Sequence, residues 1–271
     1  LDIDILKNLK FHSSLSVDYN NYDENEYWQN NTILGNAGGK ASQSITALSA
    51  VINEQTLTYN TKINKHSFNL LVGNTIQSTH VKNLTATGTN FPNDSYTQIK
   101  DASVQTAYQS KSPSTLASFF SRVGYDYNKK YYLEFTARAD GSSKFAKKWG
   151  YFPGVGVSWR ASEENFVKNI KQISNLKFRA SYGSVGNQEG IDDFASRGLW
   201  TGGYGYADNA GSTENPGTAP YQLSNPNLTW ERTTQFSTGV DLGLFNDRLA
   251  IEFNYYNKTT SDLLLKIPLP A

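Results

Sequence analysis

The feature that most constrains this chain is an alternation of apolar and polar residues with a period of two, repeated over segments of about 10 to 14 residues. Successive side chains of a β-strand point to opposite faces of a sheet, so this period predicts strands with two unlike faces. In LKFRASYGS, the apolar positions are Leu176, Phe178, Ala180 and Tyr182. The alternation recurs in YYLEFTARAD and LAIEFNYYN. We therefore expect an all-β, antiparallel fold.

Nine strands are predicted, at 9–20, 54–63, 66–78, 115–128, 130–140, 150–161, 174–186, 232–244 and 248–260. They are longer than the roughly five or six residues of a usual strand in a soluble protein. They match the roughly 9 to 11 tilted residues that cross a bilayer in a β-barrel. The longest apolar runs cover only a few residues, as at 263–265, so a membrane-spanning structure here requires strands and not helices.

Short and long connections alternate along the predicted strands. The connections at 64–65, 128–129 and 245–247 are short, whereas 79–114 and 187–231 are long. Outer-membrane barrels have short turns at the periplasmic rim and long loops outside the cell. This alternation predicts both the class of protein, a transmembrane β-barrel, and its orientation, with the chain entering from the periplasm.

One connection on the predicted periplasmic side is longer than a tight turn. Its sequence, SEENFVKNIKQIS, predicts a short amphipathic helix near 163–170. Ser162 is the expected N-cap, acidic residues fill the first turn, and Phe166 and Ile170 share one face.

Aromatic residues make up 13% of the chain and charged residues 18%. Aromatics lie near the predicted strand ends, as the interfacial girdles of a barrel would; they are Tyr125, Tyr127, Tyr131, Tyr151, Phe152, Trp159, Tyr255 and Tyr256. Charged residues on the other strand faces predict a hydrated lumen: Arg122, Glu134, Arg138, Arg179 and Glu252. The alternative is a soluble β-sandwich, with the aromatics in its core and the charges in bulk solvent.

Several functional classes have little support in the composition. The chain has no cysteine, so it cannot build a disulfide, a zinc–thiolate cluster or a thiol nucleophile. Its three histidines have no second ligand at metal spacing, and no GxSxG motif is present. A net charge of +1 gives no electrostatic footprint for nucleic acid. We expect no enzyme, no metal site, no cofactor and no nucleic-acid partner.

Four ordered motifs carry a family resemblance. They are SFFSRVGYDYNKKYYLEFTARADGSSKF (118–145), WGYFPGVGVSWRASEENF (149–166), LKFRASYGSVGNQ (176–188) and NPNLTWERTTQFSTGVDLGLFNDRLAIEFNYYNKTTSDLL (225–264). From about residue 116 onward the sequence resembles the barrel of the SusC/RagA family of TonB-dependent outer-membrane transporters, known mainly from Bacteroidetes.

The resemblance implies that residues 1–271 form part of a barrel domain of about 22 strands. The plug domain, the TonB box and the C-terminal strands are expected outside this chain. The implied function is import of a bulky nutrient, an oligosaccharide or a peptide, across the bacterial outer membrane, driven by TonB through the plug. The implied partners are TonB, a SusD-like surface lipoprotein and the outer-membrane lipid.

The predicted outer loop 187–231 holds the candidate ligand-binding residues Trp200, Tyr204, Tyr206 and Tyr221 among Gly, Asn and Thr. Flat aromatic rings beside amides are suited to stacking on sugar rings. The alternative is that they pack the loop against neighbouring loops or a partner. Two other functions stay open at this point: a passive porin or structural outer-membrane barrel, and a soluble all-β glycan-binding module.

Overall fold

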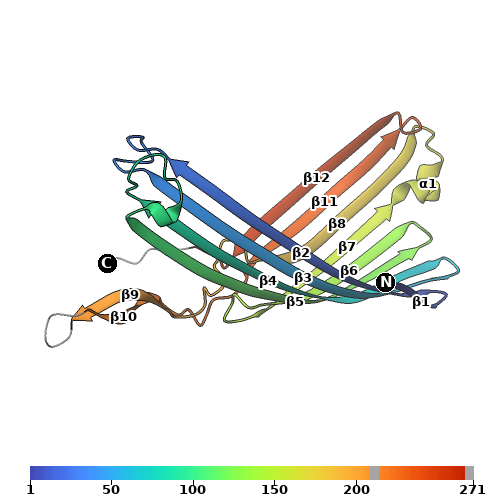
Figure 1. Cartoon of the computed structure of the whole chain (residues 1–271). Helices are drawn as coiled ribbons and strands as arrows, with labels where there is room; N and C mark the ends of the chain where they lie inside the picture. The colour runs from blue at the N-terminus through green and yellow to red at the C-terminus, as the bar shows by residue number, and fades with distance from the viewer. Residues whose placement is uncertain (208–213, 266–271) are drawn as a thin grey trace. The chain divides into compact units, whose positions relative to one another are not determined.

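The computed structural model describes residues 1–207 and 214–265. Its strands are β1 (Asp2–Leu6), β2 (Leu9–Trp28), β3 (Lys40–Ile63), β4 (His66–Thr89), β5 (Val104–Tyr127), β6 (Tyr131–Ser142), β7 (Trp149–Arg160), β8 (Ile173–Asn187), β9 (Leu199–Ala207), β10 (Glu214–Gln222), β11 (Glu231–Leu244) and β12 (Leu249–Ser261). Ten of them form one sheet in the order β1 to β8, then β11 and β12, and β9 and β10 form a separate two-stranded sheet (Figure 1). The all-β prediction is confirmed.

The chain divides into two compact units. The first comprises residues 1–14, 54–76 and 116–271, and the second comprises 15–53 and 77–115. Strands β2 to β5 contribute residues to both. The two units are described separately below.

In the first unit, antiparallel pairing extends from β5 to β12. Tyr127 pairs with Tyr131, Tyr131 with Trp159, and Trp159 with Phe178, continuing through Val240 to Phe253 in β12. Directly paired residues of an antiparallel sheet place their side chains on the same face. These rows therefore gather the apolar positions of all six strands on one face, which we call the apolar face.

Large side chains of the apolar face are widely exposed. Those between 40% and 67% exposed include Phe119, Val123, Tyr131, Leu133, Phe135, Tyr151, Val155, Val157, Phe178, Tyr182, Phe236, Leu249, Ile251, Phe253 and Tyr255. A soluble monomer rarely exposes a contiguous apolar patch of more than a few hundred Å². A sandwich would cover such a face with a second sheet, and in the described residues the other sheet is only the β9–β10 hairpin. This exposure contradicts the soluble-sandwich alternative and fits a face that meets lipid.

A compact core at one end of the first unit packs Phe145, Phe152 and Trp230 together. Their ring centroids lie 4.8 Å apart for Phe145 and Trp230 and 5.7 Å for Phe152 and Trp230. Gly186 makes room for this core, because a Cβ there would lie 2.2 Å from Cζ of Phe152. Phe152 was predicted in a girdle, but its odd spacing from Tyr151 places it on the opposite face, where it is buried. Tyr256 also departs from the girdle, since it pairs with Ser237 on that same face.

The second unit has its own small core. Ala41, Phe91 and Ala102 are buried, and Tyr27 packs edge-on against Phe91 at 5.4 Å. The connection 90–103 contains the 3₁₀ turn η1 (Ile99–Asp101). Asp94 in that connection accepts hydrogen bonds from the Tyr27 hydroxyl at 3.1 Å and the Asn30 backbone N–H at 2.8 Å. These contacts join the β2–β3 and β4–β5 connections.

All nine predicted strands are present, but four are longer than expected. The predicted loop 79–114 is wrong over most of its length, because β4 continues to Thr89 and β5 begins at Val104. Segments such as STHVKNLTATGT are polar on both faces, so the hydrophobic period disappears there although the backbone ladder continues. The short strand β1, although its sequence DIDIL alternates, and the hairpin β9–β10 were not predicted.

The predicted helix near 163–170 is shorter than expected. A 3₁₀ turn, η2 (Ala161–Glu163), precedes α1 (Asn165–Lys168), which has only four residues. Ser162 is not the N-cap: the cap position is Glu164, and its side chain makes no capping bond. Its carboxylate is instead bound by Lys130, Tyr131 and Trp159. Within the described residues no helix has the length and apolar character needed to span a membrane.

Candidate functional site

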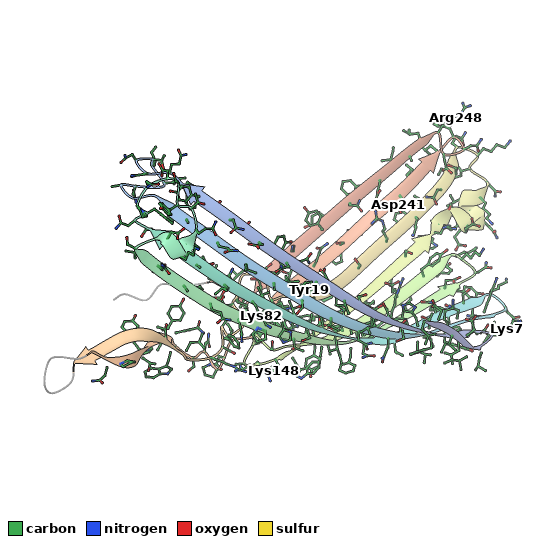
Figure 2. All side chains as sticks on the ribbon, viewed as in Figure 1. Lys7, Tyr19, Lys82, Lys148, Asp241 and Arg248 are labelled. Carbon is green, nitrogen blue, oxygen red and sulfur yellow. The ribbon has the colours of Figure 1, made fainter. Side chains whose placement is uncertain are left out.

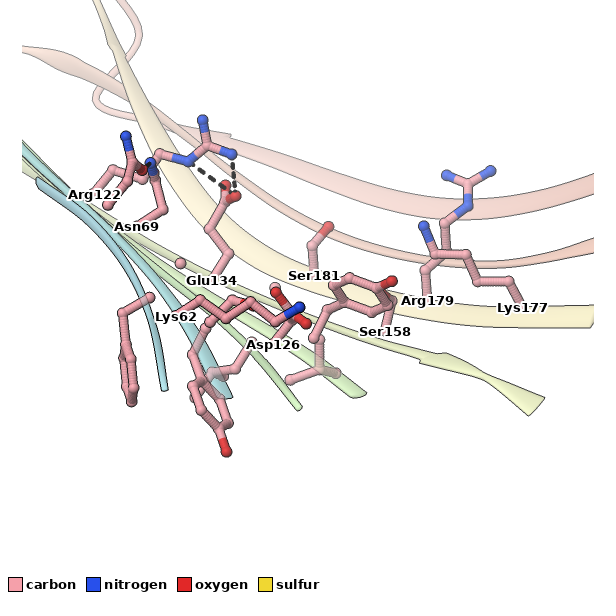
Figure 3. Close-up of a pocket in the computed structure, with 18 of the residues that line it drawn as sticks. Lys62, Asn69, Arg122, Asp126, Glu134, Ser158, Lys177, Arg179 and Ser181 are labelled. Carbon is pink, nitrogen blue, oxygen red and sulfur yellow. Dashed lines mark hydrogen bonds and ion pairs between the residues drawn. The ribbon is translucent and has the colours of Figure 1, made fainter. Parts of the chain in front are cut away.

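The candidate site is the face of the first unit opposite the apolar face, which we call the polar face. It carries an open hollow of about 1020 Å³. Charged residues of β3, β5, β6 and β8 line this hollow (Figure 3): Lys62, Arg122, Asp126, Glu134, Lys177 and Arg179. The same period of two that exposes aromatics on one face therefore brings charges together on the other.

Arg122 and Glu134 form the first ion pair of the polar face. Nε of Arg122 donates to Oε2 of Glu134 at 2.9 Å, and Nη2 donates to the same oxygen (Figure 3). Arg122 lies on β5 and pairs in register with Thr136 of β6, so Glu134 is its diagonal neighbour. Both side chains are about half exposed, at 54% and 45%. Water screens such a pair, so the main effect of the ion pair is to hold the two side chains in place on the sheet.

Arg179 on β8 binds two carboxylates from two other strands. Its Nε and Nη2 donate to Oδ1 of Asp241 at 3.2 and 3.1 Å, and Nη2 also binds Glu252 of β12. Gly239 pairs with Arg179, and a Cβ at that position would lie 3.2 Å from Cζ of the guanidinium. Glycine there lets the guanidinium cross β11 to reach β12.

A second arginine motif lies nearer the aromatic core. Nε of Arg138 donates to Oδ1 and Oδ2 of Asp140 at 2.7 and 2.8 Å, and Nη2 donates to the Ser118 hydroxyl at 2.9 Å. Asp140 and Ser118 are both buried. Arg138 also lies over the ring of Phe120, at 5.6 Å. The RADGSS motif thus forms a folded junction at the start of the 143–148 connection.

The polar face carries charges of both signs, and Arg122, Arg138 and Arg179 are each paired with an acidic residue of the same sheet. Lys177 lies 5.7 Å from the ring centroid of Tyr132, which adds an aromatic surface beside the charges. In the part of the chain that the structure describes, no cluster of three metal-binding side chains occurs. The arrangement can bind and orient polar or charged solutes through hydrogen bonds and ion pairs.

The predicted ligand-binding aromatics lie on the β9–β10 hairpin. Trp200, Tyr204 and Tyr221 are 69%, 56% and 74% exposed. Tyr206 belongs to β9, but its side chain lies outside the described part of the structure. Trp200 pairs with Pro220 and Tyr204 with Gly217, an odd separation on β10, so the register shift places these two rings on opposite faces. Within the described residues no ring contact brings Trp200, Tyr204 and Tyr221 together.

Of the predicted lumen charges, Arg122 and Glu134 are brought into contact, as are Arg179 and Glu252. The sequence reading missed Asp241 as the second partner of Arg179. The sequence TGVDLGL does indicate that Asp241 lies on the polar face, because it alternates with Val240 and Leu242. The contact itself depends on which strands are neighbours.

The chain belongs to the TonB-dependent receptor barrels: the family described as "TonB dependent receptor-like, beta-barrel" matches residues 2–271. Among curated relatives, TonB-dependent receptor P39 of Formosa agariphila is 34% identical, covering 100% of this chain and 26% of its own length. TonB-dependent receptor SusC of Bacteroides thetaiotaomicron is 36% identical, covering 79% of this chain and 21% of its own length.

Solved structures agree with this family. A structure titled as the RagAB peptide transporter matches with a TM-score of 0.86 at 25% identity, over 99% of this chain and 30% of that one. A pyoverdine complex of FpvA from P. aeruginosa, at 13% identity and a TM-score of 0.53, shares the fold. The resemblance to the SusC/RagA family is confirmed. The family consists of outer-membrane transporters and receptors, which are not enzymes, and this chain spans about a quarter of the length of its curated relatives.

Proposed function

We propose that this chain is part of the barrel wall of an outer-membrane importer for a bulky nutrient, an oligosaccharide or a peptide. The apolar face meets the lipid of the outer membrane and the polar face lines the path of the solute. The observation that supports this most directly is the separation of exposed aromatics and paired charges onto opposite faces of one antiparallel sheet.

Energy for import would come from TonB acting on a plug domain supplied by the rest of the protein. The similarity to SusC and RagAB supports this, since they match 79% and 99% of this chain. The same similarity supports a SusD-like surface lipoprotein as partner at the outer mouth. We place residues 1–271 in one partial barrel domain, with plug, TonB box and remaining strands elsewhere in the protein.

The substrate class rests on the polar face. Charges of both signs, together with Tyr132, offer donors, acceptors and an aromatic surface to a long polar molecule. Such a surface can bind the backbone amides and termini of a peptide or the hydroxyl groups of a glycan. The RagAB relative is titled a peptide transporter, which favours testing peptides first.

Uptake by cells tests this function. Cells whose full-length protein is deleted should lose growth on a peptide mixture or an oligosaccharide as sole carbon source, and the restored gene should recover it. Inactivation of TonB should abolish the uptake equally. Uptake that persists without TonB, together with steady ion conductance of the purified protein in planar bilayers, would identify a passive porin instead.

The β9–β10 hairpin remains our candidate ligand contact, through Trp200, Tyr204, Tyr206 and Tyr221. Three of these rings are exposed and free to stack on a sugar or to pack on a partner. Replacing Trp200 and Tyr204 with alanine should weaken substrate binding to the purified full-length protein. Leu223→Ala is the matched control, because Leu223 follows β10 and is 69% exposed but has no ring. Equal effects in both variants would remove the hairpin aromatics from the site.

A further inference from the structure

The connection 161–172, with η2 and α1, is bound to the strands of the first unit by one carboxylate. Oε2 of Glu164 accepts from Nζ of Lys130 at 3.0 Å, and Oε1 accepts from the Tyr131 hydroxyl at 2.8 Å. Nε1 of Trp159 also donates to Oε1, at 3.5 Å. Val167 is buried, at 4% exposure, so one side of α1 packs against the rest of the first unit. The segment is therefore held in a fixed place beside Tyr131 and Trp159.

The other side of this segment is apolar and uncovered. Phe166 and Ile170 are 66% and 43% exposed. The ring of Phe166 lies 6.3 Å from the ring of Trp159, which stacks in turn on Phe178 at 5.7 Å. Trp159 and Phe178 belong to the apolar face. Phe166 and Ile170 thus continue the apolar face beyond the ends of the strands.

Basic side chains surround the same end of the first unit. The connections at 7–8, 64–65, 128–130, 161–172 and 245–248 hold seven basic and three acidic residues. Figure 2 labels two of the basic residues, Lys7 and Arg248, at this end. Six of the seven are exposed: Lys7, Lys65, Lys129, Lys168, Lys171 and Arg248. Glu163 and Glu164 are both engaged by lysines, at 3.0 Å in each case. This end therefore carries a net positive charge beside the exposed apolar side chains of Phe166 and Ile170.

We propose that the 161–172 segment is an interfacial anchor that binds anionic phospholipid headgroups of the adjoining leaflet. Phe166 and Ile170 insert at the boundary between headgroups and acyl chains, and the lysines contact lipid phosphates. Amphipathic segments with aromatic and aliphatic residues on one side and lysines on the other bind membrane interfaces in this way. Continuity with the apolar face and the excess of basic residues both favour a lipid occupant over a protein. The inference rests on the membrane placement proposed above.

Fluorescence quenching tests the anchor in the full-length protein. The chain has no cysteine, so Phe166→Cys, Asn165→Cys and Phe253→Cys each give one labelling site here once any cysteines elsewhere are replaced. Each variant is labelled with an environment-sensitive fluorophore and reconstituted in phosphatidylethanolamine vesicles with phosphatidylglycerol. Labels at 166 and 253 should be quenched by spin-labelled lipid, and the label at Asn165, which is exposed and polar, by aqueous iodide.

The three labels separate the two levels of the proposal. If the label at 253 is reached by iodide and not by lipid, the membrane placement itself is wrong. If 253 is lipid-exposed but 166 behaves like 165, only the anchor is wrong. For the anionic preference, quenching at 166 by spin-labelled phosphatidylglycerol should exceed that by spin-labelled phosphatidylcholine. Lys171→Glu should reduce this ratio by about fivefold or more, since each basic side chain contributes ~1 kcal/mol at an anionic surface. A ratio of phosphatidylglycerol to phosphatidylcholine quenching equal to one would overturn the anionic preference. A ratio that Lys171→Glu leaves unchanged would overturn it as well.

Discussion

The indole of Trp230 donates a hydrogen bond from Nε1 to the carbonyl oxygen of Lys148 at 2.8 Å, across 82 residues of chain. The backbone N–H of Lys147 likewise donates to the carbonyl of Leu228, at 3.1 Å. Trp230 also packs on Phe145 and Phe152. Together these contacts join the connection that precedes β7 to the segment that precedes β11. This junction is the best-buried part of the first unit.

The first prediction is that Trp230→Ala lowers the free energy of unfolding by about 3 to 5 kcal/mol, because it empties a buried aromatic site. Trp200→Ala removes the same side chain from an exposed position and should change it by about 0.5 kcal/mol or less. Urea titration of the full-length protein, followed by the gel mobility of folded and unfolded barrels, measures both. Similar costs for the two tryptophans would contradict the packing described for Trp230.

The second prediction compares adjacent residues of β12. Phe253 pairs with Val240 on the apolar face, whereas Asn254 pairs with Gly239 on the polar face and donates to Glu252 at 3.0 Å. Phe253→Arg should destabilise the protein in lipid vesicles by about 2 to 4 kcal/mol, the cost of an arginine on a lipid-facing position. Asn254→Arg should cost much less, because it meets water. A larger cost at Asn254 would show that the faces are inverted.

The third prediction ranks two arginines of the polar face. Arg138 holds the Asp140 side chain, which is 11% exposed, whereas Arg122 holds that of Glu134, which is 45% exposed. Arg138→Ala leaves a buried carboxylate without its partner and should cost about 2 to 3 kcal/mol. Arg122→Ala should cost about 0.2 to 1 kcal/mol, as for an exposed pair. The same urea titration compares them, and the reverse order would show that burial of Asp140 does not decide the cost.

The fourth prediction concerns the pH dependence of the 161–172 segment. The hydrogen bond from Lys130, followed by that from Tyr131, holds the pKa of Glu164 below its ordinary value. A lowered pKa in the folded state means that the contact stabilises the protein at neutral pH and is lost as pH falls through that lowered value. Protease cleavage within 161–172 should therefore stay slow at neutral pH and accelerate only in acid, below the usual glutamate range.

A neutral variant isolates the carboxylate. Glu164→Gln should be cleaved faster than the native protein at neutral pH, with a rate that no longer rises on acidification through this range. Glu163 serves as the control, because its main partner is Lys168 within the same segment, and Glu163→Gln leaves the bonds to Tyr131 and Trp159 in place. Equal cleavage of the two variants would show that Glu164 does not hold the segment.

The sequence by itself determined which face each residue of β6, β8 and β12 occupies. The alternation of Leu176, Phe178, Ala180 and Tyr182 is a local property of an extended backbone, so it survives without knowledge of any neighbour. The short turns at 128–130 and 245–248 were equally readable, because each links two alternating runs. Resemblance to the SusC/RagA family added the class of barrel.

The tertiary structure decided which residues meet. Arg179 reaches Asp241 and Glu252 only because β8 pairs with β11, although the chain between them forms the β9–β10 hairpin. The lengths of β3 and β4 and the bonds of Glu164 also depend on partners from distant segments. Register between strands is set by the backbone ladder of the whole sheet, and a single strand's pattern contains no information on its neighbour. The separation of Trp200 from Tyr204 follows from a register shift that sequence spacing does not reveal.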